Sequence, residues 1–244
     1  MVTRSKSFLT AEWRDLVLVN YAVDPSLLGP LVPRGTELDL WDGRALISLV
    51  GFRFINTRVL GVAIWGHRHF YEVNLRFYVR RVTPEGVRRG VVFVRELVPS
   101  PAIAYIARLV YNEPYRAVPM RHSSTSKDIS RSLVYEWRER RQAEWCGVRA
   151  TTVGPPAPLV AGSQAEFISE HFWGYTRQRD GGTVEYQVAH PSWRVWETAD
   201  SQLIGDVSRT YGPTFGKVIT GGPFSTFVAE GSEVTVYRPR RLSS

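Results

Sequence analysis

Apolar and polar residues alternate with a period of two in several parts of the chain, and this pattern predicts a β-rich fold. The clearest case is the segment 72–80, EVNLRFYVR. Since successive side chains of a strand point to opposite faces, this strand has one apolar and one polar face. The apolar face carries Val73, Leu75, Phe77 and Val79, and the polar face carries Glu72, Asn74, Arg76 and Tyr78.

Other runs rich in β-branched and aromatic residues predict further strands. Two of them, 133–139 and 147–153, are spaced to pair as a hairpin. The remaining predicted strands are 16–21, 45–54, 91–97, 183–189 and 233–237.

Helices are fewer. Ser100-Pro101 predicts a capped helix start, followed by apolar residues at helical spacing. The segment 163–166, Ser-Gln-Ala-Glu, is a capping box that predicts a second helix toward His171. A third is expected from about Asp200 to Tyr211, ended by Gly212-Pro213. Many strands and few helices favour a mostly β (α+β) class, with a large antiparallel sheet or barrel.

Composition supports one folded unit over residues 1–244. The chain is 43% hydrophobic and holds eight tryptophans, enough for a large core. The segment GPPAP at 154–158 is interpreted as a loop within that domain. No apolar run approaches the ~18–20 residues that span a bilayer. The start, MVTRSKSFLT, has no apolar stretch typical of a secretory signal, and one cysteine, Cys146, cannot form an internal disulfide. A cytoplasmic location without membrane association is expected.

The formal net charge is +8, which invites a nucleic-acid interpretation. However, the arginines are scattered and no basic stripe carries a docking motif. No nucleic-acid partner is therefore expected, although a cationic field favours a small anionic ligand. Assembly of copies of this chain into a homo-oligomer is compatible with the sequence.

Two histidines, His67 and His69, have the spacing of neighbours on one strand face. With Glu72 or His190 they would make a metal site, whereas the simpler interpretation is an exposed loop pair. The simpler interpretation is favoured, and no metal or cofactor is expected. Walker, dinucleotide-binding and Gly-x-Ser-x-Gly motifs are absent.

The polar face of 72–80 has two interpretations. Periodicity alone favours a face in water; the functional alternative is a face lining a cavity. At ~3.3 Å per residue, Glu72 and Arg76 are roughly 13 Å apart along the strand, so one small ligand would reach both, with Asn74 midway. A partly buried carboxylate gains a raised pKa and can act as acid or base, and arginine can hold a substrate carboxylate.

A proline-shaped segment, 111–122, follows the first predicted helix and carries Glu113, Tyr115 and Arg116. It is either a functional loop or an ordinary connection. The aromatic segments 171–175 and 190–193 are expected to supply core or pocket walls.

Six stretches are informative when taken together: FLTAEWRDLVLVNYAVDP (8–25), LVPRGTELDLWDGRALISLVGF (31–52), EVNLRFYV (72–79), HFWGY (171–175), AHPSW (189–193) and EGSEVTV (230–236). Their combination resembles the uncharacterised YqjF-like family of bacterial proteins. That family is a distant relative of acetoacetate decarboxylase, so the resemblance implies a mostly antiparallel, β-barrel-like fold with a central cavity.

The resemblance to the decarboxylase implies roles for individual residues. Arg14 precedes a Tyr-x-x-Asp-x-x-x-Leu stretch, as an arginine does in the decarboxylase. Ser48 stands where the decarboxylase has an early-strand glutamate, and Tyr71-Glu72 matches a later one. The segment 113–116, Glu-Pro-Tyr-Arg, replaces Tyr-Pro-Lys-Lys, so both lysines of the Schiff-base chemistry are missing.

Imine-based decarboxylation needs a primary amine, which tyrosine and arginine do not supply. The resemblance, together with the positive net charge, therefore implies a cavity protein that binds a small organic acid, such as a keto acid, with or without lysine-independent lyase or isomerase activity. Glu72 and Tyr115 are the predicted catalytic residues. The predicted substrate-binding residues are Arg14, Ser48, Asn74, Arg76 and Arg116. The alternative is a non-catalytic structural or sensory relative that kept the fold.

Overall fold

The computed structural model describes residues 6–141 and 143–242. Residues 1–5, the beginning of the segment expected not to be a secretory signal, lie outside the described residues. Strands dominate the described chain, and all those in named elements belong to one sheet. No helix among the described residues is long and apolar enough to cross a membrane.

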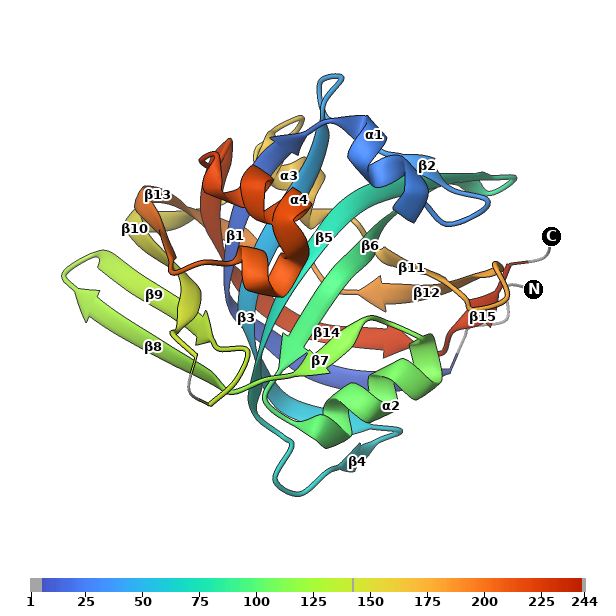
Figure 1. The fold of residues 1–244 in the computed structure, drawn as a ribbon, viewed down its shortest axis with the longest axis horizontal. Coiled ribbons are helices and arrows are strands. Elements are labelled where there is room, and N and C mark those ends of the chain that lie inside the picture. The colour runs from blue at the N-terminus through green and yellow to red at the C-terminus, as the bar shows by residue number, and fades with distance from the viewer. Residues whose placement is uncertain (1–5, 142, 243–244) are drawn as a thin grey trace.

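Five long strands form the centre of this sheet, each antiparallel to its neighbours (Figure 1). In spatial order they are β6 (Gly86–Val98), β5 (Phe70–Thr83), β3 (Ala45–Val59), β1 (Ser7–Val23) and β14 (Ser225–Tyr237).

Two shorter strands close these five into a ring. β11 (Trp173–Arg177) runs parallel to β6 and pairs with β12 (Thr183–Ala189). β12 in turn pairs with β14 at Val188↔Val236, so β1, β3, β5, β6, β11, β12 and β14 make a closed strand ring. The predicted large, mostly antiparallel, barrel-like sheet is confirmed.

The sheet also continues outward from β14 as a second layer. This extension contains β13 (Arg194–Ile204), β10 (Cys146–Pro158), β9 (Ser130–Trp137) and β8 (Met120–Lys127). β9 and β10 pair as the predicted hairpin. The GPPAP segment, predicted as a loop, instead belongs to β10, where the pairing with β13 shifts between Val153 and Ala157.

Short strands complete the sheet, among them β7 (Tyr115–Ala117), which runs parallel to β6. The others are β2 (Glu37–Leu38) on β5, β4 (Val62–Ala63) on β3 and β15 (Arg240–Arg241) on β12.

Two predicted helices are confirmed. α2 (Pro101–Tyr111) is capped by Ser100, and α3 (Gln164–Ser169) is capped by the Ser163 hydroxyl oxygen, which accepts from the Glu166 amide at 3.1 Å. A four-residue helix, α1 (Pro25–Leu28), leads into the 3-10 turn η1 (Gly29–Leu31).

The third predicted helix was wrong in its bounds. Residues 200–204 belong to β13, because they pair with β10, and α4 spans Ser208–Thr220. Gly212-Pro213 kinks this helix without ending it. Gly212 takes φ 79° and ψ 167°, a conformation open to glycine, and Pro213 then starts the second helical segment.

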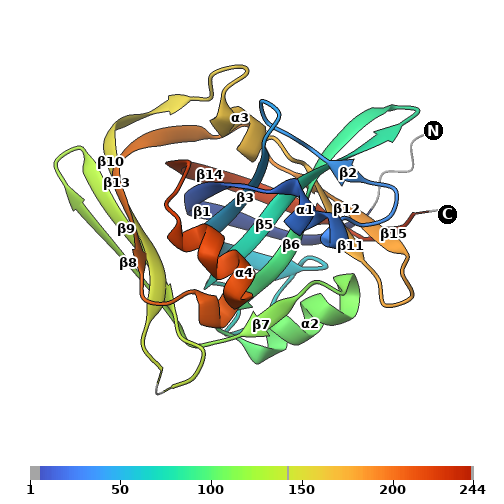
Figure 2. The same ribbon diagram turned by 45° about the horizontal axis from the view of Figure 1, so that its top comes forward.

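The two faces of β5 explain where the cavity lies. Val73, Leu75, Phe77 and Val79 pack outside the strand ring, in a core shared with β9, β10 and α4. Figure 2 shows the positions of β9, β10 and α4 relative to the ring. Glu72, Asn74, Arg76 and Tyr78 consequently face the ring interior. The apolar face is buried by the second layer, so the polar face is free to line the interior.

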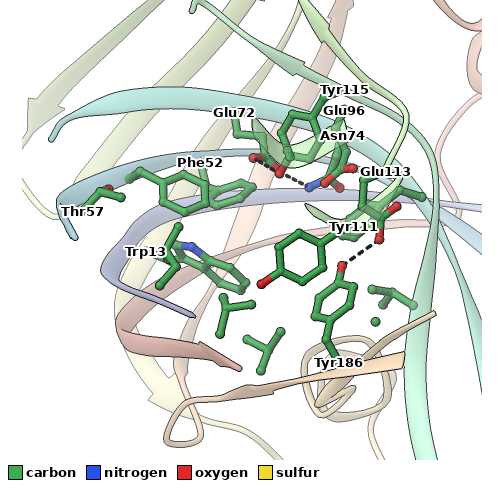
Figure 3. A pocket seen from close by; sticks show the side chains of 18 of the residues that line it. Trp13, Phe52, Thr57, Glu72, Asn74, Glu96, Tyr111, Glu113, Tyr115 and Tyr186 are labelled. Carbon is green, nitrogen blue, oxygen red and sulfur yellow. Dashed lines mark hydrogen bonds between the residues drawn. The ribbon is translucent and has the colours of Figure 1, made fainter. Parts of the chain in front are cut away.

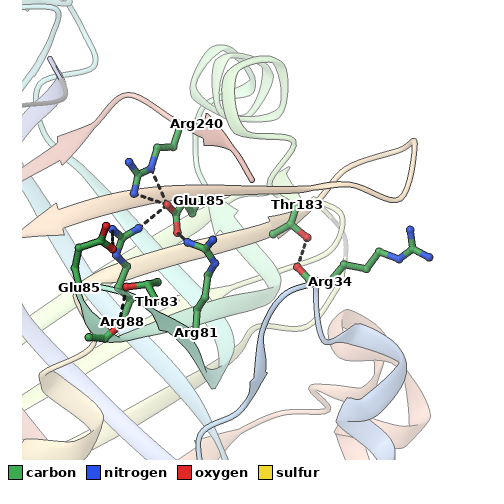
Figure 4. A network of polar contacts seen from close by, with 9 residues as sticks. Arg34, Arg81, Thr83, Glu85, Arg88, Thr183, Glu185 and Arg240 are labelled. Carbon is green, nitrogen blue, oxygen red and sulfur yellow. Dashed lines mark hydrogen bonds and ion pairs between the residues drawn. The ribbon is translucent and has the colours of Figure 1, made fainter. Parts of the chain in front are cut away.

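A buried carboxylate forms ion pairs with arginines of three other strands (Figure 4). Glu185 of β12 forms ion pairs with Arg81 of β5 at 3.3 Å, Arg88 of β6 at 2.8 Å and Arg240 of β15 at 2.6 Å. One side chain therefore connects four strands near the site of ring closure.

Candidate functional site

A cavity of about 170 Å³ lies inside the strand ring. Its walls are mainly apolar and aromatic, with Trp13, Phe52, Phe93 and Trp173 among the lining residues. Polar side chains gather on one part of the wall, contributed by β5, β6, β7 and the turn after α2 (Figure 3). Apolar walls with a few convergent polar groups are typical of a small-molecule site.

Glu72 is the central polar residue of this wall and is 2% exposed. The Asn74 side-chain amide donates to its Oε1 at 3.0 Å, and the Tyr115 hydroxyl donates to its Oε2 at 2.9 Å. Burial raises the pKa of Glu72 to about 7, while these two hydrogen bonds and the positive charge of Arg76 act in the opposite direction. The carboxyl group is therefore poised to take or give a proton near neutral pH.

Two further buried glutamates, Glu96 and Glu113, line the cavity beside Glu72. Glu113 Oε1 accepts hydrogen bonds from the Thr176 hydroxyl and, at 2.8 Å, from the Tyr186 hydroxyl. Burial raises the pKa of Glu113 to about 7. Burial, followed by repulsion from Glu113 and Glu72, raises the pKa of Glu96 well above its usual value. We call Glu72, Glu96 and Glu113 the carboxyl cluster.

A second polar group on the cavity wall consists of Arg76, Ser169 and His171, here called the Arg76 group. Arg76 donates to the Ile168 carbonyl at 3.4 Å, which holds its guanidinium group beside the end of α3. Arg76 Nε, Ser169 Oγ and His171 Nδ1 are buried atoms without a hydrogen-bond partner. Buried polar atoms usually form hydrogen bonds, so these three atoms are candidates to bond a ligand in the cavity.

His171 is held by a carboxylate on its other ring nitrogen. Its Nε2 lies 3.0 Å from Asp39 Oδ2, and the same oxygen accepts from Arg89 at 2.7 Å. Burial lowers the pKa of His171 to about 4, so the ring is neutral at pH 7. With Nε2–H donating to Asp39, Nδ1 presents a lone pair and can accept a hydrogen bond.

Four of the predicted site residues line the cavity: Glu72, Asn74, Arg76 and Tyr115. Of the aligned polar residues, Glu72 and Tyr115 are in direct contact, as described above.

The other three predicted residues lie outside the cavity lining. Arg14 pairs with Glu12 at 2.8 Å and donates to the Gly231 carbonyl at 3.2 Å. Arg116 is 43% exposed and pairs with Glu139 at 2.5 Å. Ser48 is fully buried and is bonded to Asn20 at 2.6 Å and to the Tyr78 hydroxyl at 2.5 Å. Their hydrogen-bonding capacity is therefore directed to other protein groups.

The two histidines considered as a metal pair diverge. His67 lines the cavity, whereas His69 Nδ1 accepts from the Asn56 amide at 3.4 Å. Over residues 6–141 and 143–242, no group of three or more His, Cys, Asp or Glu is arranged to hold a metal ion.

The sequence did not indicate Glu96, Ser169 and Asp39 as site residues, nor a polar role for His171. A charged residue within the apolar run VVFVREL could have indicated Glu96, whose Cα pairs with that of Asn74 across β5 and β6. His171 was expected to form a wall and does line the cavity. Its hydrogen bond to Asp39 joins residues 132 positions apart, and no local sequence pattern predicts such a pair.

Comparison with known proteins places the chain in a family. Residues 10–233 match the DUF2071 family model, described as "Uncharacterized conserved protein". The chain belongs to the DUF2071 family. It is 43% identical to the uncharacterized protein YqjF of Bacillus subtilis (strain 168) over 203 residues, which cover 83% of this chain and 81% of that protein. The predicted family resemblance is confirmed.

Solved structures similar to this DUF2071 protein include acetoacetate decarboxylase from Legionella pneumophila subsp. pneumophila str. Philadelphia 1. That structure has a TM-score of 0.66 and 13% identity, covering 97% of this chain and 87% of the decarboxylase. The enduracididine biosynthesis enzyme MppR complexed with pyruvate has a TM-score of 0.66 and 14% identity, covering 99% of this chain and 92% of MppR. These matches confirm the acetoacetate decarboxylase-like fold.

Proposed function

We propose that this DUF2071 protein binds a small organic acid in the cavity of its strand ring, and that Glu72 and Tyr115 perform acid–base chemistry on it. The observation that carries the proposal is Glu72 itself. It is a buried carboxyl on a cavity wall, hydrogen-bonded to a phenol, with its pKa raised to about 7. A group with this pKa can exchange a proton with a substrate at neutral pH.

Lysine-independent chemistry is part of the proposal. None of Lys6, Lys127 and Lys217 lines the cavity. The residue after Pro114, where the resemblance to the decarboxylase would place a lysine, is Tyr115. Lys217 lies in α4, on the outer side of the strand ring. An imine between the substrate and a lysine of the wall is therefore not part of the mechanism.

Arg76 supports a carboxylate as the ligand's anionic group. It is the guanidinium group among the residues that line the cavity, and its Nε–H has no acceptor. A carboxylate is the acceptor that best matches arginine in charge and geometry. MppR, whose fold is similar, has been solved in complex with pyruvate, a small keto acid, and this supports the same class of ligand.

In this mechanism Arg76 holds the carboxylate, and the keto acid directs C3, the carbon beyond its carbonyl group, toward Glu72. Ionised Glu72 takes a proton from that carbon. The electron pair of the broken C–H bond forms the C=C bond of an enolate, and the carbonyl oxygen takes the negative charge. Tyr115 fixes the direction of the Glu72 carboxyl through its hydrogen bond.

A second candidate is a non-catalytic binding or sensory protein with the same fold. The largely aromatic wall and the absence of a lysine from it favour this alternative. Binding is common to both candidates, and proton transfer separates them.

Isothermal titration calorimetry with pyruvate, 2-oxobutanoate and longer 2-keto acids tests the shared claim. We expect saturable binding with a preference for longer apolar chains, because the cavity wall is mainly apolar. No binding by any member of the series would overturn the proposal.

A further inference from the structure

The carboxyl cluster contains buried acceptor atoms that lack a donor. Glu96 Oε2 and Asn74 Oδ1 have no hydrogen-bond partner, and both side chains are 2% exposed and line the cavity. Both residues lie on the same part of the wall in Figure 3. Asn74 Oδ1 is an acceptor, and Glu96 Oε2 becomes one once Glu96 loses its proton, so a donor group that also stabilises ionised Glu96 completes this site.

The charge of the cluster indicates which kind of donor is missing. Each hydrogen bond described above for Glu72 and Glu113 comes from a neutral group: Asn74, Tyr115, Thr176 or Tyr186. Among the described residues, no arginine, lysine or histidine forms an ion pair with Glu72, Glu96 or Glu113. Carboxylates buried together are stabilised by an added cation, so a cationic donor fits better than a neutral one.

Within the Arg76 group, Arg76 itself lacks a hydrogen-bond acceptor. Arg76 Nε is an unpartnered donor, and its guanidinium group carries the positive charge of this part of the wall. Arg76 and Glu72 are four residues apart on the same face of β5, roughly 13 Å along the strand. Apolar side chains such as Phe52, Val91 and Phe93 make up much of the remaining wall.

We propose that the ligand of this cavity is a zwitterion, an ω-amino acid whose ammonium group binds Glu96 and Asn74 Oδ1 and whose carboxylate binds Arg76. The methylene chain then lies along the apolar wall. This inference rests on the proposed binding of an organic acid and adds the ligand's second charged group.

Matched probes of equal chain length test the inference. The probes are 6-aminohexanoate, hexanoate and hexylamine, with 4-aminobutanoate as a shorter zwitterion, titrated calorimetrically at pH 7.5. The wild-type protein is expected to bind 6-aminohexanoate at least tenfold more tightly than hexanoate. Glu96→Gln, which keeps the shape of the side chain but cannot ionise, is expected to abolish this advantage and to change hexanoate affinity less than twofold.

One control variant and one independent measurement accompany the titration. Glu37→Gln removes an exposed glutamate that pairs with Arg80 outside the cavity, so it should leave all affinities unchanged. Proton release is measured on the wild-type protein in two buffers of different ionisation enthalpy. The ammonium group should displace protons from the carboxyl cluster, whereas hexanoate should not. This readout needs no variant and holds even if Glu96→Gln fails to fold.

The outcomes separate the two claims. Equal affinity for hexanoate and 6-aminohexanoate, with no proton release, overturns the zwitterion and leaves organic-acid binding intact. Binding of hexylamine without hexanoate overturns the proposed function and retains the cation site. Zwitterion binding that Glu96→Gln does not weaken overturns the assignment of the ammonium group to Glu96.

Discussion

The Tyr115 hydroxyl donates a 2.9 Å hydrogen bond to Glu72 Oε2 inside the strand ring. Glu72 lies on the long strand β5, whereas Tyr115 lies on the three-residue strand β7, and β6 runs between them in the sheet. The contact thus joins the central sheet to the segment that follows α2. It also places a phenol against the carboxyl group that we propose as the acid–base residue.

Tyr115→Phe removes this hydrogen bond and little else. The bond favours the ionised carboxylate, so its loss should raise the pKa of Glu72 above about 7. The free energy of unfolding should fall by about 1–2 kcal/mol, the usual cost of losing such a bond. Carboxyl carbon NMR during a pH titration measures the first effect and urea unfolding the second. An unchanged Glu72 titration would contradict the assigned contact.

The raised pKa of Glu72 predicts how stability depends on pH. The folded protein keeps the Glu72 proton up to about pH 7, whereas the unfolded chain loses it near the ordinary value of 4.5. The folded state therefore binds more protons between these values, and this group's contribution to stability falls as pH rises from about 4.5 to 7. The full effect is on the order of 3 kcal/mol.

Comparison with Glu72→Gln isolates this contribution from that of other groups. The wild-type protein should lose stability relative to the variant between pH 4.5 and 7, and the difference should level off above pH 7. The neighbouring groups that titrate or carry charge remain in both proteins: Arg76, Glu96, Tyr111, Glu113, Tyr115 and Tyr186. Parallel stability curves over this range would show that Glu72 titrates as an ordinary carboxyl.

Arg76→Gln should weaken binding of 2-keto acids at least tenfold, because it removes the cation proposed to hold the carboxylate. Arg80→Gln is the matched control, since Arg80 lies on the same strand but pairs with Glu37 outside the cavity. Calorimetry on both variants measures the contrast. Equal losses in the two would indicate a general effect of net charge instead of a specific contact.

Glu185→Gln should destabilise the fold by about 3–5 kcal/mol, because it removes the partner of three arginines near the site of ring closure. Glu37→Gln, at an exposed pair, should cost less than about 1 kcal/mol. Thermal or urea unfolding distinguishes them. Similar small losses in both would mean that Glu185 does not hold the four strands together.

The alternation of 72–80 predicted the two faces of β5 correctly, but the favoured interpretation of the polar face as a face in water was wrong, because Glu72 and Asn74 are buried and line the cavity. Periodicity reports only that the faces differ. Here the apolar face packs against α4 and the β9–β10 layer, so the side chains of Glu72 and Asn74 point into the ring. That arrangement depends on contacts between segments far apart in the chain, so only the family resemblance pointed to it.

The resemblance was informative for Glu72 and Tyr115 and less so for the arginines. Arg14 and Arg116 have local carboxylate partners, Glu12 and Glu139, that a distant comparison does not register. Helix caps such as Ser100 were predictable because they depend on neighbouring residues. The His171–Asp39 pair was not, because it forms only when distant segments meet.

Deuterium exchange at C3 of 2-oxobutanoate tests the central claim most directly. Proton NMR in D₂O follows loss of the C3 signal with wild-type protein and with Glu72→Gln. The account predicts that the wild-type protein accelerates exchange and that Glu72→Gln still binds the keto acid but loses at least a hundredfold of that rate. Binding by the wild-type protein without any acceleration, or equal exchange by both proteins, would contradict it.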